Sequence, residues 1–310
     1  MSCASRPSAS RIPTSLAARI PTAITSAVTS AMPSASTALR PARIAAPIAT
    51  LLQGVLRALL LAGVVSLAHA EGAAQPPVDP LNSPSWEQMH ARMLNGEPYE
   101  FSDLITVLGP DSAEDPTNVP VSVHIDPGIV VKRVVVFADL NPIQKVIELE
   151  PFEVPASFGF RIKLEQATPL RAAALTDAGI WLVGGRWVDS AGGGCTQPSA
   201  GRVSGNWHET IGQFRGLTFG EGAHLSRVRF RIMHPMDTGL SPGIPAFFID
   251  RITVSDAADV PLANLNVFEP ISENPYFTLD LADLATDRQP LKFEVHDIGG
   301  NEFKHQVAAE

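Results

Sequence analysis

One cysteine stands out among the residues that could do chemistry, because three glycines lead into it. The segment is Gly192-Gly193-Gly194-Cys195. Glycine has no Cβ and reaches backbone conformations closed to other residues, so three in a row predict a thin and flexible arm. A thiolate attacks sulfur electrophiles and forms disulfide-type bonds that a later reaction can break. The pattern favours a thiol that is carried into a narrow channel of another protein.

An enzyme would need a different arrangement around this thiol. A catalytic nucleophile is held rigidly, with a base within hydrogen-bonding distance. His208 and His224 follow Cys195 in the sequence, but no known nucleophile signature surrounds them. We therefore predict no catalytic residue and expect that the protein is not an enzyme. The plain alternative is an incidental thiol in a linker between domains.

His234-Pro235-Met236 is the other segment with possible ligands. A histidine and a methionine two residues apart on an extended segment share a face, which would suit copper or haem iron. A metal site needs more ligands, and the other histidines show neither H-x-H nor H-x-x-H spacing. We interpret the segment as a turn that closes a strand, and predict no metal and no cofactor.

Arg227, Arg229 and Arg231 alternate with apolar residues in the second half of the chain. On a strand they would share one face. Such a face is usually solvated or paired with local acids. Binding of an anionic cargo group or of an acidic partner is the functional alternative.

The first 70 residues have the layout of an export signal. Residues 1–50 are rich in Ala, Ser, Pro and Thr, and an apolar run from Leu51 to Leu67 ends in Ala68-His69-Ala70. A basic region, an apolar region and a small-residue cleavage site are typical of secretory signal peptides. We predict cleavage after Ala70, a periplasmic location and no stable membrane insertion afterwards. A single uncleaved membrane anchor is the alternative.

The predicted mature chain is acidic and has one thiol. The first 70 residues hold six of the 23 basic residues and none of the 32 acidic ones, so the remaining 240 residues carry a net charge of −15. This charge argues against nucleic acid as a partner. Cys3 lies in the leader, so Cys195 has no partner for an intramolecular disulfide. Disulfide-linked dimerisation through Cys195 remains an alternative.

The mature sequence predicts one short N-terminal helix and otherwise short strands. Ser83 suits the helix N-cap and Gly96 its end, with an apolar stripe of Trp86, Met89 and Met93. The predicted strands of the first half are Val119–Ile125, Val130–Phe137, Val146–Leu149, Phe158–Leu164, and a hairpin of Ile180–Val183 with Arg186–Val188 around Gly184-Gly185. Strands resume near Leu225 and continue as Ala246–Val254, Leu262–Phe268, Tyr276–Leu279 and Leu291–Val295.

This pattern predicts a mainly β protein with two immunoglobulin-like β-sandwich domains, joined by a glycine-rich linker that bears the cysteine. We expect a leader at 1–70, a first sandwich at 71–191, an arm and linker at 192–223, and a second sandwich at 224–310.

Several short motifs, in the same order, resemble a fused SoxY–SoxZ sulfur carrier. In the first half they are Asn118–Val121, Asn141-Pro142, Phe160–Leu164 and Gly193-Gly194-Cys195; in the second half they are Ile232–Gly239, Pro245–Ile249, Ser272–Pro275 and Asp297–Gly300. The chain is similar in particular to the SoxYZ-like carriers associated with quinoprotein dehydrogenases.

The resemblance implies that Cys195 carries a covalent sulfur adduct for partner enzymes, because it aligns with the cysteine of the SoxY carboxy-terminal arm. In this chain Thr196-Gln197-Pro198 follows the cysteine in place of glycines, and the arm is fused at both ends. The implied partners are periplasmic sulfur-oxidation enzymes, or a quinoprotein dehydrogenase and its cytochrome. A non-covalent adaptor for the dehydrogenase is the alternative. The carrier hypothesis predicts a solvent-accessible thiol on a flexible hinge, and a thiol buried in hydrophobic packing would argue against it.

Overall fold

The computed structural model describes residues 77–205, 207–221 and 223–308, which belong to one compact unit. The predicted N-terminal helix is α2 (Trp86–Met93), with Trp86 and Met89 buried. It begins after Ser85, two residues later than the predicted N-cap Ser83. None of the helices in these described ranges is both long enough and apolar enough to cross a membrane.

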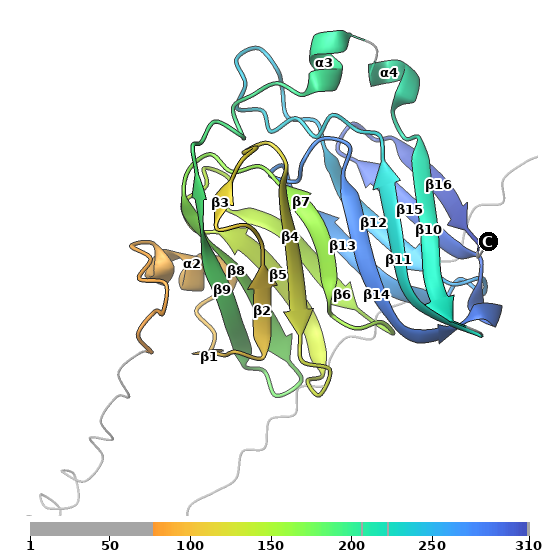
Figure 1. Cartoon of the computed structure of the whole chain (residues 1–310), viewed down its shortest axis with the longest axis horizontal. Coiled ribbons are helices and arrows are strands. Elements are labelled where there is room, and N and C mark those ends of the chain that lie inside the picture. Colours follow the sequence, from red (N-terminus) through yellow and green to blue (C-terminus); the bar gives the residue numbers. More distant parts are fainter. Residues whose placement is uncertain (1–76, 206, 222, 309–310) are drawn as a thin grey trace, which may run out of the picture. The chain divides into compact units, whose positions relative to one another are not determined.

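Two β-sheets form the body of the protein (Figure 1). The ten-stranded sheet has the order β1 (Tyr99–Phe101), β9 (Trp181–Ser190), β8 (Thr168–Thr176), β5 (Val131–Ala138), β6 (Lys145–Pro151), β13 (Pro261–Val267), β12 (Ile249–Ser255), β15 (Leu291–Asp297) and β16 (Glu302–Val307), with β3 (Ser112–Ala113) also beside β9. The six-stranded sheet has the order β10 (Phe214–Glu221), β11 (His224–Ile232), β14 (Tyr276–Ala285), β7 (Phe158–Ile162), β4 (Val119–Ile125) and β2 (Ile105–Leu108).

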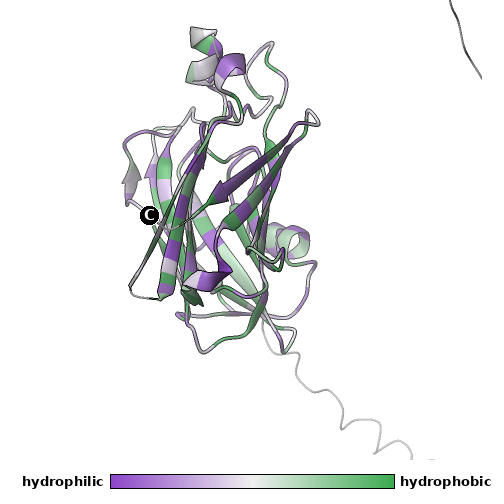
Figure 2. Ribbon diagram, turned by 90° about the vertical axis from the view of Figure 1, so that its right-hand side faces the viewer, coloured by the Kyte–Doolittle hydropathy of each residue, from purple (hydrophilic) through white to green (hydrophobic). Residues whose placement is uncertain are grey.

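Alternating sequence explains why the two sheets stack. In β4, the residues Val119, Val121, Val123 and Ile125 are buried, and those between them face outward. Successive side chains of a strand point to opposite faces, so each sheet has one apolar face to cover. The same alternation of apolar and polar residues is visible along many strands in Figure 2. The mainly β, sandwich-type architecture predicted from the sequence is confirmed.

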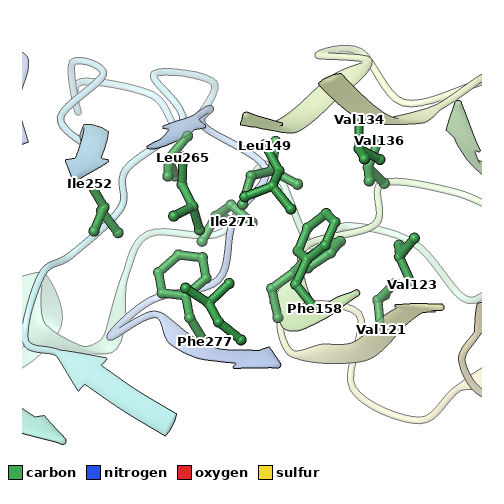
Figure 3. Close-up of a cluster of buried hydrophobic side chains, with 14 of the residues drawn as sticks. Val121, Val123, Val134, Val136, Leu149, Phe158, Ile252, Leu265, Ile271 and Phe277 are labelled. Atoms are coloured by element: carbon green, nitrogen blue, oxygen red, sulfur yellow. The ribbon is translucent and has the colours of Figure 1, made fainter. Parts of the chain in front are cut away.

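The two halves of the chain share both sheets. Strands β1–β9 form the first half and β10–β16 the second, and they join where β6 pairs with β13 and where β7 pairs with β14. At the first junction Leu149 lies opposite Leu265. One apolar core runs between the sheets through both halves, as Figure 3 shows around Ile271. The two sandwiches are thus joined edge to edge as well as through the chain, which covers strand edges that would otherwise be exposed.

The predicted hairpin at Gly184-Gly185 is wrong, because β9 runs straight through it. A Cβ at Gly184 would collide with the carbonyl oxygen of Ile105, and one at Gly185 would lie 2.8 Å from the carbonyl oxygen of Leu170. The glycines allow a close backbone approach within a strand and do not form a turn.

Residues 192–223, expected to be an arm and linker, contain regular structure. Two short helices, α3 (Ala200–Ser204) and α4 (Trp207–Thr210), are followed by the edge strand β10. A short 3₁₀ helix, η1 (Thr286–Arg288), follows β14. The expected division into a leader, two sandwiches and a linker remains a prediction. In the structure the two sandwiches are halves that share one apolar core.

The shared sheets predict that both halves unfold together. Leu149→Ala removes a fully buried side chain at the β6–β13 junction, and should lower the free energy of unfolding by about 2–5 kcal/mol. Hydrogen exchange should show this loss in core amides of β5 and equally in those of β12. Val130→Ala, at a side chain that is 65% exposed, serves as the control and should change stability by less than about 0.5 kcal/mol. A loss confined to the first half would contradict the single core.

Candidate functional site

Cys195 lies in the segment after β9, residues 191–199, which we call the Cys195 segment. Its side chain is fully buried. The thiol lies next to Lys163, just past the end of β7, and its Sγ is 3.6 Å from the carbonyl oxygen of that residue. The structure therefore differs from the solvent-accessible thiol expected from the sequence.

The glycines before Cys195 pack closely against the first half. Gly192 and Gly193 have φ values of +89° and +83°, in the left-handed region that favours glycine. A Cβ at Gly194 would collide with the carbonyl oxygen of Pro116. The amides of Gly193 and Gly194 donate to the carbonyl oxygens of Glu165 and Leu164, at 3.2 and 3.0 Å. In this conformation Gly192–Gly194 is an ordered, close-packed segment, in contrast to the flexible arm that the sequence predicts.

Hydrogen bonds from both halves fix the Cys195 backbone. In the first half, the Glu165 carboxylate accepts from the Cys195 amide at 3.0 Å and from the Thr196 hydroxyl at 3.2 Å. In the second half, the Thr238 hydroxyl donates to the Cys195 carbonyl oxygen at 2.5 Å, and the Ser241 hydroxyl donates to the Thr196 carbonyl oxygen at 2.6 Å. The segment therefore lies at the junction of the halves and is held by polar groups of each.

The surroundings keep the thiol protonated. Burial, followed by the negative charge of the nearby Glu165 carboxylate, raises the pKa of Cys195 to about 12, and Lys163 opposes this shift with a smaller effect. Burial also lowers the pKa of Lys163 to about 8, against the opposing effects of Cys195, Asp237, Glu273 and Glu269. The Lys163 ammonium donates a hydrogen bond to the carbonyl oxygen of Met236. Because the thiolate is the nucleophile, Cys195 is unreactive in this conformation.

A cavity of about 720 Å³ adjoins the Cys195 segment. Gly194 and Lys163 line it on one side, and Arg231 and Asn274 of the second half line it on another. Residues of both halves therefore bound an open space directly beside the Cys195 segment.

His234 and Met236, which follow β11, form hydrogen bonds within the protein. The buried His234 Nε2 lies 3.4 Å from Asp297 Oδ2, and its Nδ1 accepts from the Met236 amide at 3.1 Å. Burial lowers the pKa of His234 to about 4, so the ring is neutral. Met236 Sδ accepts from the Ile249 amide. Among the residues that the structure describes, no group of three or more His, Cys, Asp or Glu is placed to hold a metal ion.

No Cys–His pair forms in the described part of the chain. The charged groups that shift the Cys195 pKa are Glu165 and Lys163. His208 instead lies on α4 against the ring of Trp207, with 4.2 Å between the ring centroids.

Four residues that hold the Cys195 segment or shift the pKa of its thiol were not predicted from the sequence: Lys163, Glu165, Thr238 and Ser241. One signal was available, since Lys163 interrupts the apolar end of the predicted strand Phe158–Leu164. A lysine at such a position is usually buried only where it has a charged or polar partner.

Two family models match the chain in tandem. The model of sulfur oxidation protein SoxY matches residues 90–195, and the model of sulphur oxidation protein SoxZ matches residues 221–308. Together they cover well over half of the chain. A solved structure of the sulfur carrier protein SoxY from Chlorobium limicola f thiosulfatophilum is similar over 34% of this chain and 96% of its own, with 19% sequence identity and a TM-score of 0.31. No curated protein sequence matches significantly.

The two matches on this β-sandwich define a carrier protein of sulfur oxidation, and the SoxY match ends at Cys195. The second match makes the assignment narrower. This chain belongs to the fused SoxY–SoxZ proteins, with a SoxY domain followed by a SoxZ domain in one polypeptide.

The raised pKa predicts an unusual pH profile for Cys195. An exposed thiol has a pKa near 9.0, whereas the buried thiol keeps its proton up to about pH 12. Burial therefore contributes stability that is fully present below pH 9 and is lost progressively towards pH 12. The rate of alkylation by iodoacetamide should rise about tenfold per pH unit between pH 8 and 10.5 without levelling off. A peptide of residues 192–199 should level off near pH 9. Levelling at the same pH in the folded protein, verified by circular dichroism, would contradict burial.

Glu165→Gln should loosen the Cys195 segment. It removes a charged acceptor of two hydrogen bonds and a negative charge beside the thiol. Hydrogen bonds to charged groups contribute about 1.5–3 kcal/mol, so alkylation of Cys195 at pH 8 should accelerate about 10- to 100-fold. Glu87→Gln, an exposed position on α2, is the matched control and should leave the rate unchanged. An unchanged rate in both variants would show that Glu165 does not hold the segment closed.

Proposed function

We propose that this protein is a periplasmic carrier that holds a covalent sulfur adduct on Cys195 for partner enzymes of sulfur oxidation. The observation that carries the proposal is the position of this thiol. Cys195 is the last residue of the SoxY match and the free cysteine of the described residues. It also lies where the SoxY-type and SoxZ-type halves meet.

The carrier function requires that the Cys195 segment leave its buried position. Besides the thiol contact and the close packing of Gly192–Gly194, hydrogen bonds to Glu165, Leu164, Thr238 and Ser241 hold it. A net hydrogen bond contributes about 0.5–1.5 kcal/mol, or about 1.5–3 kcal/mol where the acceptor is the Glu165 carboxylate. Opening then costs several kcal/mol as a local rearrangement, without unfolding of the core. The buried conformation is then the resting state, with a protonated thiol that does not react with stray electrophiles.

Formation of the sulfur adduct on Cys195 is an oxidation, so the partner must provide an electron acceptor. When the Cys195 thiol joins the terminal sulfur of an anion such as thiosulfate, an S–S bond forms, the S–H bond breaks, and one proton and two electrons are released. A partner that supplies an electron acceptor must remove those electrons. This fits an enzyme or cytochrome of the periplasm, where the predicted leader at residues 1–70 would deliver the chain.

A second function, that of a non-covalent adaptor for a quinoprotein dehydrogenase and its cytochrome, is favoured by one observation. Cys195 is fully buried, so an adaptor could act without exposing it. In that case Cys195→Ser would keep both its partners and its activity.

Intact-mass measurement on the protein purified from sulfur-fed cells distinguishes the two functions. A carrier should show added mass that maps to Cys195 and disappears on mild reduction, and a Cys195→Ser strain should lose most sulfur-dependent growth. The control is Thr106→Ala, which removes an exposed hydroxyl on β2 of the first half and should leave growth normal. Unmodified Cys195 together with normal growth of the Cys195→Ser strain would overturn the carrier proposal and leave the adaptor.

A further inference from the structure

The outer face of the six-stranded sheet is basic at the second half of the chain. Strands β10, β11 and β14 lie side by side there (Figure 1). Val228, Phe230 and Ile232 of β11 point into the core, so the residues between them point outward. The outward positions described on these strands are Arg215, Leu217, Phe219, Arg227, Arg229, Arg231, Tyr276, Thr278 and Asp280. We call this surface the arginine face.

The arginine face has few acids to balance it. Arg227 pairs with Asp280 at 2.8 Å, but within the described residues Arg215, Arg229 and Arg231 form no ion pair. The predicted mature chain as a whole is acidic, with 32 acidic residues against 17 basic ones after the first 70 residues. Four of those 17 basic residues, Arg215, Arg227, Arg229 and Arg231, lie together on the paired strands β10 and β11.

One pair within the face costs stability. In the register of β10 and β11, Arg215 lies directly opposite Arg231. Like charges directly opposite on neighbouring strands destabilise a sheet. Both side chains are exposed, so neither is needed in the core. An arrangement that costs stability and fills no core position is typical of a surface kept for binding.

The apolar and aromatic residues of the arginine face are of the types that are common at protein interfaces. Leu217 and Phe219 are 50% and 40% exposed. The Arg229 guanidinium lies over the rings of Phe219 and Tyr276, with 5.3 and 5.8 Å to the ring centroids. Arginine and aromatic residues are enriched at protein–protein interfaces, because they combine apolar area with directed hydrogen bonds.

The arginine face reaches the thiol site. Arg231 lies at the end of β11, and lines the same 720 Å³ cavity as Gly194 and Lys163. With Arg215 it also lines a second hollow of about 570 Å³, which Gln213 and His305 border as well. A protein seated on the face would therefore lie beside the cavity that adjoins the Cys195 segment.

We propose that the arginine face docks an acidic protein partner, the one that receives the Cys195 segment. The biological role of this docking rests on the proposed carrier function, but the contact between the two proteins does not involve the thiol. Complementary charge would steer the partner and orient it with the thiol site at its edge.

Photo-crosslinking in the source organism, grown on a reduced sulfur compound, tests the docking. A benzoylphenylalanine replaces Leu217 at the middle of the face, and in a control strain it replaces Val130 of the first half. The expected result is a crosslink from position 217, absent from position 130, to a protein whose identified sequence is acidic. No crosslink at 217, or a crosslink to a second copy of this chain, would overturn the proposal.

Arg215→Glu separates docking from folding, because the two should change in opposite directions. The new carboxylate would face Arg231 and replace a repulsion with an ion pair, so the unfolding midpoint should rise. The crosslink yield should fall about tenfold, because one steering charge is reversed. Arg92→Glu, an exposed arginine on α2, is the matched control and should keep the yield. An undiminished yield in Arg215→Glu would overturn the proposal.

A Cys195→Ser background separates the inference from the proposed function. The crosslink at 217 should persist there, since docking does not use the thiol. If the crosslink persists while no adduct forms on Cys195 of the unaltered protein, the docking surface stands and the carrier function falls. If adducts form but charge reversal leaves the crosslink intact, the carrier function stands and the arginine face is not its docking site.

Discussion

The pairing of β6 with β13 and of β7 with β14 is the constraint on which the thiol site depends. These two junctions make the sheets continuous, so the end of β7 and the loop after β11 are held at fixed positions on the two halves. Glu165 follows β7, and Thr238 and Ser241 follow β11. Their hydrogen bonds meet on the backbone of Cys195 and Thr196 only because the halves cannot slide past each other. Fusion in one chain ties the halves together, but it is the strand register that brings the polar groups to the same few atoms.

The glycines before Cys195 have a different role from the one their sequence suggests. A run of glycines before a cysteine predicts a flexible backbone, yet here the glycines permit close contact with backbone carbonyl oxygens and left-handed φ values. For the proposed carrier, the same residues would also limit the cost of opening. Gly192–Gly194 have no side chains to bury, so release would forfeit hydrogen bonds, backbone packing and the burial of one small thiol. The conformation in this structure excludes solvent from the sulfur.

Strand positions were predictable where side chains alternate, as in Val119–Ile125, and the order of the short motifs gave the family. Neither of these signals indicates which segments far apart in the sequence lie side by side in the fold. The continuous run through Gly184-Gly185 depends on the backbone of Ile105, far away in sequence, so a glycine pair was taken for a turn. Burial of Cys195 likewise depends on Glu165 and Thr238, whose positions follow from the sheet register. Local composition predicts the conformations a segment can adopt, whereas its neighbours in space decide which one is occupied.

If Cys195 acts as the proposed carrier, opening of its segment has to be driven by something that binds the open state better than the closed one. A ligand of equal affinity for both states shifts nothing, however tightly it binds. Small sulfur anions are poor candidates, since the closed thiol beside Glu165 offers them neither a thiolate nor a positive pocket free of carboxylates. A protein partner has more surface with which to distinguish the two states. It can accept the released hydrogen-bonding groups of residues 193–196 in its own channel, and these are satisfied by this protein only while the segment is closed. For the proposed carrier, the free energy for opening would then come from the contacts of the segment with the partner, so the thiol would become reactive only where that partner is already bound.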